Sequence, residues 1–189
     1  METAANLPLW CPFSNFDAAD SRARQASTAA RHLALAQVGA GGHIRISQQK
    51  IADTDPLDNQ IGYVFWPGSF LDDVVAALKR GAKVDILVSN HLANYSGGYT
   101  DDMGGKALQG VIADLMGSAP AGLTVKRMPD PVSNHAKVWI ANDQVFYVGS
   151  DNVYPAFLQE YGFVVADAAA TANFIKTYWN PIWAQGETP

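Results

Sequence analysis

The stretch HAKVWIANDQVFYVGSDN, residues 135–152, restricts the fold of this chain more than any other. It holds two short apolar runs, VWIA and VFYV, on either side of Asn142-Asp143. Short runs rich in β-branched and aromatic residues around two turn-forming residues predict a β-hairpin. The fold must therefore provide an antiparallel strand pair whose open end carries His135, Lys137 and the GSDN sequence.

Polar side chains are expected to gather at that open end. Residues two apart on a strand point to the same face, so His135 and Lys137 would emerge together, about 6.6 Å apart. At the end of the second strand, Gly149 would let the backbone turn tightly and bring Ser150 and Asn152 to the same end of the sheet. The sequence thus predicts a nucleophile, a cation and two hydrogen-bonding side chains at one place.

These residue types suit the chemistry of a phosphodiester. Neutral imidazole can attack phosphorus and form a covalent intermediate, while a second, protonated imidazole gives a proton to the departing alcohol. Lys137, Ser150 and Asn152 would meet the non-bridging oxygens, whose negative charge grows in the transition state. Glu160 opens an apolar strand shortly after Asn152, and its carboxylate would hold His135 in one tautomer.

Each of these features has an ordinary explanation when it stands alone. An HxK pair on a strand is usually a solvated polar face, Gly-Ser before Asn is a common turn, and Glu160 alone would be a surface charge. The combination of HxK, a fixed gap, GSxN and a carboxylate at the start of an apolar strand favours a phosphodiesterase.

At this spacing, HxK and GSxN resemble the HKD motif of the phospholipase D superfamily. The segments HIRISQQ, RGAKVDILVS, SGGY, FYVGSDNVYP and LQEYGFVV are similar to the C-terminal half of secreted bacterial phospholipases D. The resemblance runs from about Ala26 to Trp183, which is nearly the whole chain. It implies a phospholipase D-like domain that acts on a phospholipid or another phosphodiester.

The resemblance also implies a role for individual residues. His135 would be the nucleophile or the acid, and Glu160 would be its carboxylate partner. Lys137, Ser150 and Asn152 would contact the phosphate, and Lys137 and Asn152 would also belong to the catalytic set. The resemblance implies no metal ion and no cofactor.

One position departs from the family pattern, which places an aspartate five residues after the lysine. Here that position is Asn142, with Asp143 directly behind it. The gap from Lys137 to Gly149 is unchanged, so a substitution explains the difference better than a shift in register. Because a hairpin turn favours both Asn and Asp, we expect a structural role that Asn can fill.

Composition limits the class of protein. With 189 residues, 48% hydrophobic and 16% charged, the chain fits one globular domain that buries roughly 70% of its unfolded surface. Cys11 is the single cysteine, so no intrachain disulfide can form. The N-terminus lacks the pattern of a secretory leader, and no stretch of ~18 apolar residues occurs. The compartment stays open, and the chain would be secreted if a leader has been removed.

The formal net charge of −5 argues against a sequence-independent grip on nucleic acid, which requires Lys and Arg to neutralise phosphates. Nucleic acid is therefore the less favoured partner. Lys126 and Arg127 are candidates for a local basic groove, although a solvated strand end is the favoured explanation of both. The absence of CxxC, HExxH, Walker-type and GxSxG motifs leaves zinc, nucleotide and serine-hydrolase functions unsupported.

Helical and strand patterns alternate along the rest of the chain. We expect an N-terminal arm over residues 1–25 and a catalytic domain over residues 26–189. The predicted elements are a helix from Ala26, a strand from His43, a helix capped by Ser69 that runs to about Arg80, the strand KVDILVS, the helix GKALQGVIADLM, the strand LTVKRM, the hairpin, the strand YGFVVAD and a last helix around TANFIKTYWNPIW. The β-α-β order predicts partly parallel pairing, and hence an α/β fold with a mixed sheet flanked by helices on both faces.

Weaker candidates lie outside the hairpin. His91, in a glycine-rich stretch that reads as a long loop over residues 90–105, would either line the site or be an exposed loop histidine. The aromatic stretch GYVFWPGSFL, from Gly62, would either touch a lipid interface transiently or pack ahead of the helix from Ser69. His32 and His43 are predicted to lie on different elements.

The chain holds one HxK and no internal repeat, although the chemistry requires two histidines. We expect the second to come from another copy of the chain in a homodimer, or from an N-terminal half that is not in this sequence. The favoured function is hydrolysis or transphosphatidylation of a phospholipid head-group ester. One alternative is a dimeric single-motif endonuclease of the same superfamily. The other is a catalytically silent half-domain with a binding or assembly role, which Asn142 and the missing second motif would support.

Overall fold

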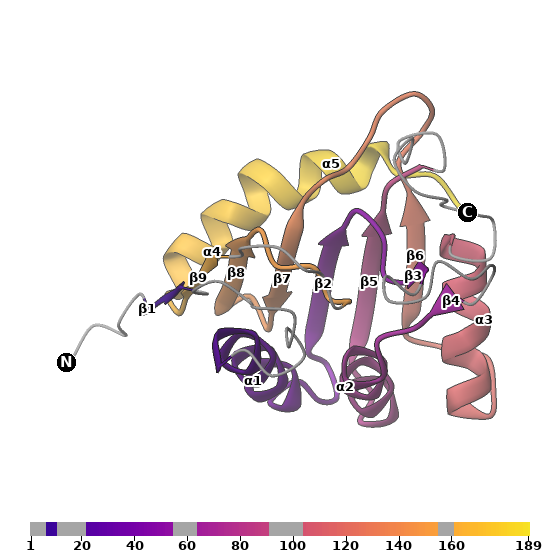
Figure 1. The fold of residues 1–189 in the computed structure, drawn as a ribbon, viewed down its shortest axis with the longest axis horizontal. Coiled ribbons are helices and arrows are strands. Elements are labelled where there is room, and N and C mark those ends of the chain that lie inside the picture. Colours follow the sequence, from indigo (N-terminus) through magenta and orange to yellow (C-terminus); the bar gives the residue numbers. More distant parts are fainter. Residues whose placement is uncertain (1–6, 11–21, 55–63, 91–103, 155–160) are drawn as a thin grey trace.

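A computed structural model of the chain describes residues 7–10, 22–54, 64–90, 104–154 and 161–189 (Figure 1). Its centre is a seven-stranded mixed sheet, with helices on both faces. The predicted fold class is confirmed. In chain order the elements are β1 (Leu7–Trp10), α1 (Arg22–Ala36), β2 (His43–Gln48), β3 (Asp53–Thr54), β4 (Val64–Phe65), α2 (Gly68–Lys79), β5 (Lys83–Val88), α3 (Gly105–Met116), β6 (Leu123–Arg127), β7 (Lys137–Ala141), β8 (Val145–Gly149), β9 (Tyr161–Val165), α4 (Ala168–Phe174), the π-helix η3 (Ile175–Trp179) and α5 (Asn180–Gln185).

The sheet has the strand order β1-β9-β8-β7-β2-β5-β6, and a separate small ladder joins β3 to β4. Strands β2, β5 and β6 run parallel to one another, whereas β7, β8, β9 and β1 each run antiparallel to their neighbours. The predicted parallel pairing of HIRISQQ with KVDILVS is confirmed by the β2–β5 register. The hairpin adds its strands to the β2 side of this parallel core.

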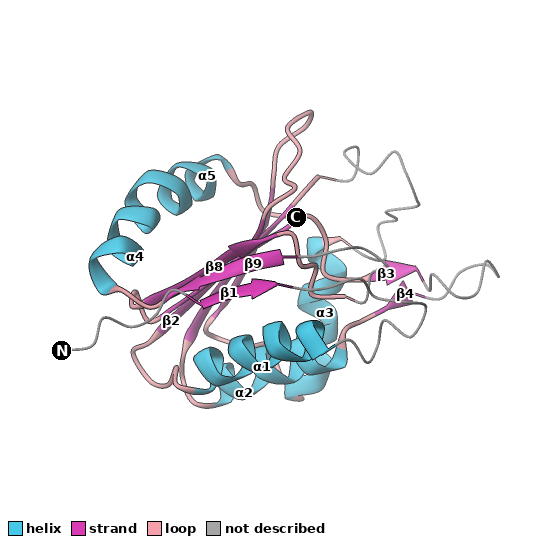
Figure 2. Cartoon of the chain, turned by 60° about the vertical axis from the view of Figure 1, so that its left-hand side comes forward, coloured by secondary structure: helices cyan, strands magenta, loops and turns pink. Residues whose placement is uncertain are grey.

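Two helical layers cover the sheet (Figure 2). Helices α1, α2 and α3 lie on one face, and the continuous run α4-η3-α5 crosses the other. The larger core cluster packs under α1 and α2 and includes Leu35, Ile46 and Phe70. The smaller cluster forms beneath the C-terminal helices around Ile140 and Trp179. Both faces of β7 are therefore buried, which explains why its residues read as a continuous apolar run.

The hairpin forms where the sequence predicts it. Strands β7 and β8 pair antiparallel from Val138↔Val148 to Ala141↔Val145. The two turn residues, Asn142 and Asp143, have φ angles of 52° and 56°. Positive φ at both central residues is the signature of a two-residue type I′ turn, for which Asn is well suited.

Three boundaries differ from the sequence prediction. Helix α1 starts at Arg22 rather than Ala26, and Leu7–Trp10 adds an edge strand within the predicted arm. Helix α2 starts at Gly68 after Pro67, and no side chain caps it; Ser69 was the wrong cap, because its hydroxyl instead accepts a 3.5 Å bond from Arg31. The division of the chain at residue 25 stays a prediction.

The last helix changes its winding in the middle. Residues Ile175–Trp179 form a π-turn between α4 and α5. Pro181, in the first turn of α5, has no backbone N–H, so a regular α-helical bond cannot run through it. Among the described residues, no helix combines the length and the apolar character needed to cross a membrane.

Candidate active site

His135 and Lys137 lie at the end of the sheet where the parallel strands β2 and β5 finish. The β2–β7 ladder begins with the pair Gln48↔Lys137. His135 therefore lies just before the strand, whereas the sequence had predicted it to lie on the strand. Lys137 is 4% exposed, and its Nζ donates a 3.0 Å hydrogen bond to the backbone oxygen of His135. The ammonium group is therefore held against the histidine backbone within the protein.

The imidazole of His135 is biased toward its neutral form. Although much of the residue is exposed, partial desolvation of the ring lowers its pKa, and the positive charge of Lys137 lowers it further. Both effects penalise the charged imidazolium. A neutral imidazole is the form that can act as a nucleophile near neutral pH.

Asn134, directly before His135, is a buried side chain that the sequence analysis missed. Its Nδ2 donates to Ser47 Oγ at 3.0 Å, to the Gln48 carbonyl at 3.2 Å and to the Leu87 carbonyl at 3.4 Å. These three acceptors lie at the ends of β2 and β5. The amide thus joins the histidine segment to the two central parallel strands.

Further bonds complete this connection. The backbone N–H of Asn134 donates to Ser89 Oγ at 2.9 Å, and its Oδ1 accepts a 3.0 Å bond from the backbone N–H of Ala136. The hydroxyl of Tyr178, from the π-turn, donates to Ser47 Oγ at 3.2 Å. Burial raises the pKa of Tyr178, partly offset by that bond, so the phenol stays protonated and can donate.

A sequence signal for this network exists. Buried polar residues stand at the ends of both strands: Ser47 and Gln48 end β2, and Ser89 directly follows β5. Polar residues that are buried need hydrogen-bond partners. Their position at the ends of strands predicts a polar contact there, but the sequence does not show which residue supplies it.

The GSDN sequence connects β8 to the start of β9. The Ser150 hydroxyl accepts a 2.9 Å bond from the Tyr161 N–H and donates to its carbonyl at 3.3 Å. Asp151 is buried and accepts a hydrogen bond from Ser27 on α1. Asn152 is also buried, at 7% exposure. The roles of Ser150 and Asn152 as phosphate contacts stay predictions.

Gly149 is needed for a close approach and not for a tight turn. It stands opposite Gly162 on β9, and the ring of Tyr147 lies over both. A Cβ at Gly149 would come within 2.3 Å of the Tyr147 hydroxyl, and one at Gly162 within 2.3 Å of its ring. The ring of Tyr147 thus excludes a side chain at Gly162, and at Gly149 the backbone of β9 excludes one as well, because a Cβ there would lie 2.5 Å from the Tyr161 carbonyl oxygen.

Other sequence candidates lie away from this end or carry other contacts. His32 lies 2.5 Å from Asp73 on α2, and His43 lies 2.8 Å from Asp85 at the opposite end of β2. Lys126 donates to the Trp183 carbonyl at 3.1 Å. Arg127 faces Glu187 at 3.5 Å and Asp130 at 3.6 Å, so both predicted basic residues contact the C-terminal segment.

Some candidates cannot be placed in this way. Glu160, His91 and the SGGY segment lie outside the described residues. Of the aromatic stretch from Gly62, Phe70 is fully buried and Leu71 nearly so, which favours the packing alternative for that part. Among the described residues, no group of three or more His, Cys, Asp or Glu side chains gathers as a metal site would require.

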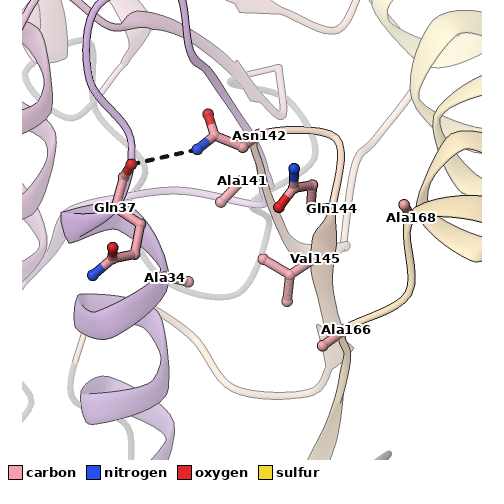
Figure 3. A pocket seen from close by; sticks show the side chains of 8 residues that line it. All are labelled: Ala34, Gln37, Ala141, Asn142, Gln144, Val145, Ala166 and Ala168. Carbon is pink, nitrogen blue, oxygen red and sulfur yellow. Dashed lines mark hydrogen bonds between the residues drawn. The ribbon is translucent and has the colours of Figure 1, made fainter. Parts of the chain in front are cut away.

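Asn142 directly follows β7, at the end of the strand away from the histidine. Figure 3 shows its surroundings. Its backbone N–H donates to the His43 carbonyl at 3.0 Å, and its Nδ2 donates to the Gln37 carbonyl at 3.4 Å. Next to it is a pocket of about 340 Å³. The lining is Ala34, Gln37, Ala141, Asn142, Gln144, Val145, Ala166 and Ala168, and none of these residues is charged.

No protein-family model matches the sequence. Phospholipase D from Streptomyces antibioticus is 28% identical over 76% of this chain. Nuc from Salmonella typhimurium, described as a phospholipase D family member, has the same fold with a TM-score of 0.58 at 20% identity. The chain is thus similar in sequence to a phospholipase D and similar in fold to a phospholipase D family member. Phosphatidylserine synthase from Haemophilus influenzae Rd KW20 shares the fold, with a TM-score of 0.62 at 15% identity.

These relatives differ in length. The matched region covers 29% of the Streptomyces phospholipase D. The superposition with the Haemophilus synthase covers 96% of this chain but 39% of the synthase. By contrast, the superposition with Nuc covers 84% of this chain and 88% of Nuc. For NucT from Helicobacter pylori the shares are 88% and 92%, with a TM-score of 0.59 and 12% identity. The chain thus matches whole small proteins as well as parts of longer ones.

Proposed function

We propose that the chain is a phospholipase D-like phosphodiesterase that cleaves a phospholipid head-group ester through a phosphohistidine intermediate. The observation that carries the proposal is the pairing of His135 with the buried Lys137 at one end of the sheet, where the pKa of the imidazole is lowered. The sequence similarity to the Streptomyces phospholipase D supports a lipid substrate.

In the first step, the neutral imidazole of His135 attacks phosphorus and forms an N–P bond while the P–O bond to the leaving alcohol breaks. Lys137 lies beside the attacking group and would neutralise the charge that grows on the non-bridging oxygens. Ser150 and Asn152 are proposed to contact the same oxygens. The departing oxygen takes a proton from a second imidazolium.

In the second step, water or an alcohol attacks the phosphohistidine. The second histidine, now neutral, accepts the proton of the attacking group, and the N–P bond breaks to release His135. Water gives hydrolysis, and an alcohol gives transphosphatidylation. Glu160 is proposed to hold His135 by its other ring nitrogen and to stabilise the charged form.

The second histidine is proposed to come from another copy of this chain or from an N-terminal half of a longer protein. Beside the motif, the cross-strand pair Val148 and Phe163 is 39% and 44% exposed, and Tyr161 is 59% exposed. An apolar patch next to an incomplete site supports a partner surface there. A two-fold homodimer would bury about 1,200–2,000 Å² in total.

Turnover of a chromogenic phosphodiester tests the proposal directly. His135→Asn should abolish both turnover and the acid-labile phosphoprotein that accumulates with labelled substrate, because covalent catalysis is removed. Retention of more than a trace of wild-type activity would contradict the assignment. Glu160→Gln should lower activity while leaving the melting temperature nearly unchanged, since shape is kept and only the charge is lost.

The predicted absence of a metal requirement needs its own measurement. Incubation with EDTA should leave the turnover of the wild-type chain unchanged. An enzyme that EDTA silences and a divalent cation restores would contradict the phosphohistidine mechanism.

Assembly can be measured independently of chemistry. Sedimentation at micromolar concentration should show a dimer, and Phe163→Glu should give a monomer without turnover. A monomer that turns over substrate would refute the paired site. An inactive monomer would instead favour a missing N-terminal half.

A single-motif endonuclease is the second candidate, because this chain matches Nuc and NucT over almost their entire lengths. Parallel assays on a phospholipid vesicle and on single- and double-stranded DNA separate the two substrates. A silent half-domain is the third candidate. Asn142 gives it little support, since that residue lies at the end of β7 away from His135.

A further inference from the structure

We propose that Asn134 is a positioning residue for His135, and that Tyr178 and Ser47 hold Asn134 in place. The inference rests on the proposed function of His135 as nucleophile. It extends that function to a chain of three side chains that leads from the C-terminal helix to the attacking group.

The first step concerns the backbone of His135. Because the β2–β7 ladder begins at Gln48↔Lys137, His135 lies just outside the sheet. Its described backbone contact is the bond from Lys137 Nζ to its carbonyl. The position of the imidazole therefore depends strongly on its neighbour Asn134, which is 8% exposed and anchored to two strands.

The second step concerns the chemical identity of residue 134. Its Nδ2 faces Ser47 Oγ and the carbonyls of Gln48 and Leu87, so a donor is required there. Its Oδ1 receives the N–H of Ala136, so an acceptor is required on the other side. An amide satisfies both, whereas a carboxylate would place an acceptor against three acceptors.

The third step concerns the support from the C-terminal helix. Ser47 is fully buried and accepts bonds from both Asn134 Nδ2 and the Tyr178 hydroxyl. Tyr178 reaches it from the π-turn Ile175–Trp179. Removal of the phenol would leave the Ser47 oxygen with one donor fewer and loosen the acceptor that holds Asn134.

Small displacements of a nucleophile lower the reaction rate strongly. The reacting atoms must lie about 3–3.5 Å apart and in line, and a displacement of about 1 Å costs about 10²-fold in rate. Asn134→Ala and Asn134→Asp should therefore lower kcat by about 10²-fold with little change in KM. Tyr178→Phe should lower kcat by about 10-fold, as expected for one hydrogen bond.

A matched control lies one residue away from Tyr178. Thr177 is exposed on the same π-turn, and its hydroxyl bonds only to the Asn173 carbonyl at 2.8 Å among the described residues. Thr177→Val removes a hydroxyl from the same helix without touching the network. It should leave kcat and the pH dependence of kcat/KM as in the wild type.

The pH profile and chemical reactivity separate positioning from a purely structural role. In Tyr178→Phe, the acid limb of kcat/KM and the rate of His135 carbethoxylation by diethyl pyrocarbonate should both change, and in Thr177→Val neither should. A loss of melting temperature with unchanged kcat, pH profile and carbethoxylation in folded Tyr178→Phe and Asn134→Asp would overturn the proposal. If Asn134 variants do not fold, Tyr178→Phe decides alone.

If His135 is not the nucleophile, the variants should give a different set of results. His135→Asn with retained turnover would remove the nucleophile assignment, and the carbethoxylation rates would still report whether Tyr178 and Asn134 position the ring. A dead His135→Asn beside wild-type behaviour of Tyr178→Phe and Asn134→Asp would refute the positioning role only.

Discussion

The two ends of strand β7 differ in what surrounds them. At its start, Lys137 donates to the His135 carbonyl, and Asn134 just before it donates to the carbonyls of Gln48 on β2 and Leu87 on β5. At its other end, Asn142 and Asp143 form a type I′ turn on the surface, beside a pocket without charged side chains. One end is tied to the parallel strands by buried hydrogen bonds, and the other reverses the chain.

This difference explains why the motif can vary at one position. The segment that resembles the HKD motif spans β7, so its last residue falls in the turn, five residues and about 16 Å along the strand from the lysine. Asn142 contributes there through its positive φ and its bond to the Gln37 carbonyl. The predicted structural role of Asn142 fits this placement, and activity should depend on the start of the strand alone.

The largest expected effect comes from Lys137→Met, which keeps the length of the side chain and removes its charge. Turnover should fall by about 10²–10³-fold, as when one transition-state donor is lost. Lys83→Met is the matched control, because Lys83 lies at the opposite end of the sheet and pairs with Asp85 at 3.0 Å. Comparable losses in both variants would show that the two ends do not differ in function.

The same substitution sharpens the comparison through the histidine. Because the pKa of His135 is lowered from its ordinary value near 6.5, the imidazole stays neutral at more acidic pH. The fall of kcat/KM on the acid side should therefore occur below pH 6.5. In Lys137→Met the pKa should rise, because one cause of its lowering is gone, although desolvation remains. NMR titration of the imidazole measures this, and an unchanged pKa would contradict the electrostatic account.

A third expectation concerns stability at the far end. Burial raises the pKa of Asp85, but bonds to His43 and Lys83 outweigh burial and leave it lowered. A lowered pKa gives stability above the unfolded-state value that is lost as pH falls through the folded-state value. Asp85→Asn should therefore melt below the wild type at pH 7, with a gap that narrows below about pH 4. A gap independent of pH would show that the charge is not responsible.

The smallest effects are expected at the turn. Asn142→Asp should change turnover less than twofold, because Asp tolerates positive φ and the site is distant. Asn142→Ala should cost about 1 kcal/mol of unfolding free energy, since alanine is strained at φ 52°. Gln144→Ala, at an exposed position beside the turn, serves as the control in denaturant titrations. A tenfold loss of activity in Asn142→Asp would place the turn in the mechanism.

Local patterns allowed most of the fold to be predicted from the sequence. The hairpin, the parallel β2–β5 pair and the C-terminal helix follow from apolar periodicity and turn residues, which act over a few positions. The expected placement of His135 and Lys137 on one strand face was wrong, because β7 begins only at Lys137, and the two residues meet through the His135 carbonyl instead. The start of α2 was misjudged because Pro67, and not the Ser69 side chain, precedes its first turn.

The rest of the site depends on distant contacts that no local pattern encodes. Asn134 binds Ser47 across 87 positions and Leu87 across 47. Tyr178 reaches Ser47 across 131 positions, from a π-turn whose winding leaves no clear periodic signal. The role of Gly149 was misread for the same reason, because the ring that excludes a side chain there also covers Gly162 on another strand.

The stacking of Tyr147 over Gly149 and Gly162 has a consequence for how this sequence can change over generations. A side chain at either glycine collides with the ring, while loss of the ring alone leaves two facing glycines bare on paired strands. At Gly149 a Cβ would also come within 2.5 Å of the Tyr161 carbonyl oxygen, so a smaller residue at 147 does not make room there. At Gly162 the printed contacts are all with the Tyr147 ring, so alanine at 162 needs a smaller residue at 147. Variants of this domain should therefore keep Gly149 and should exchange positions 147 and 162 together.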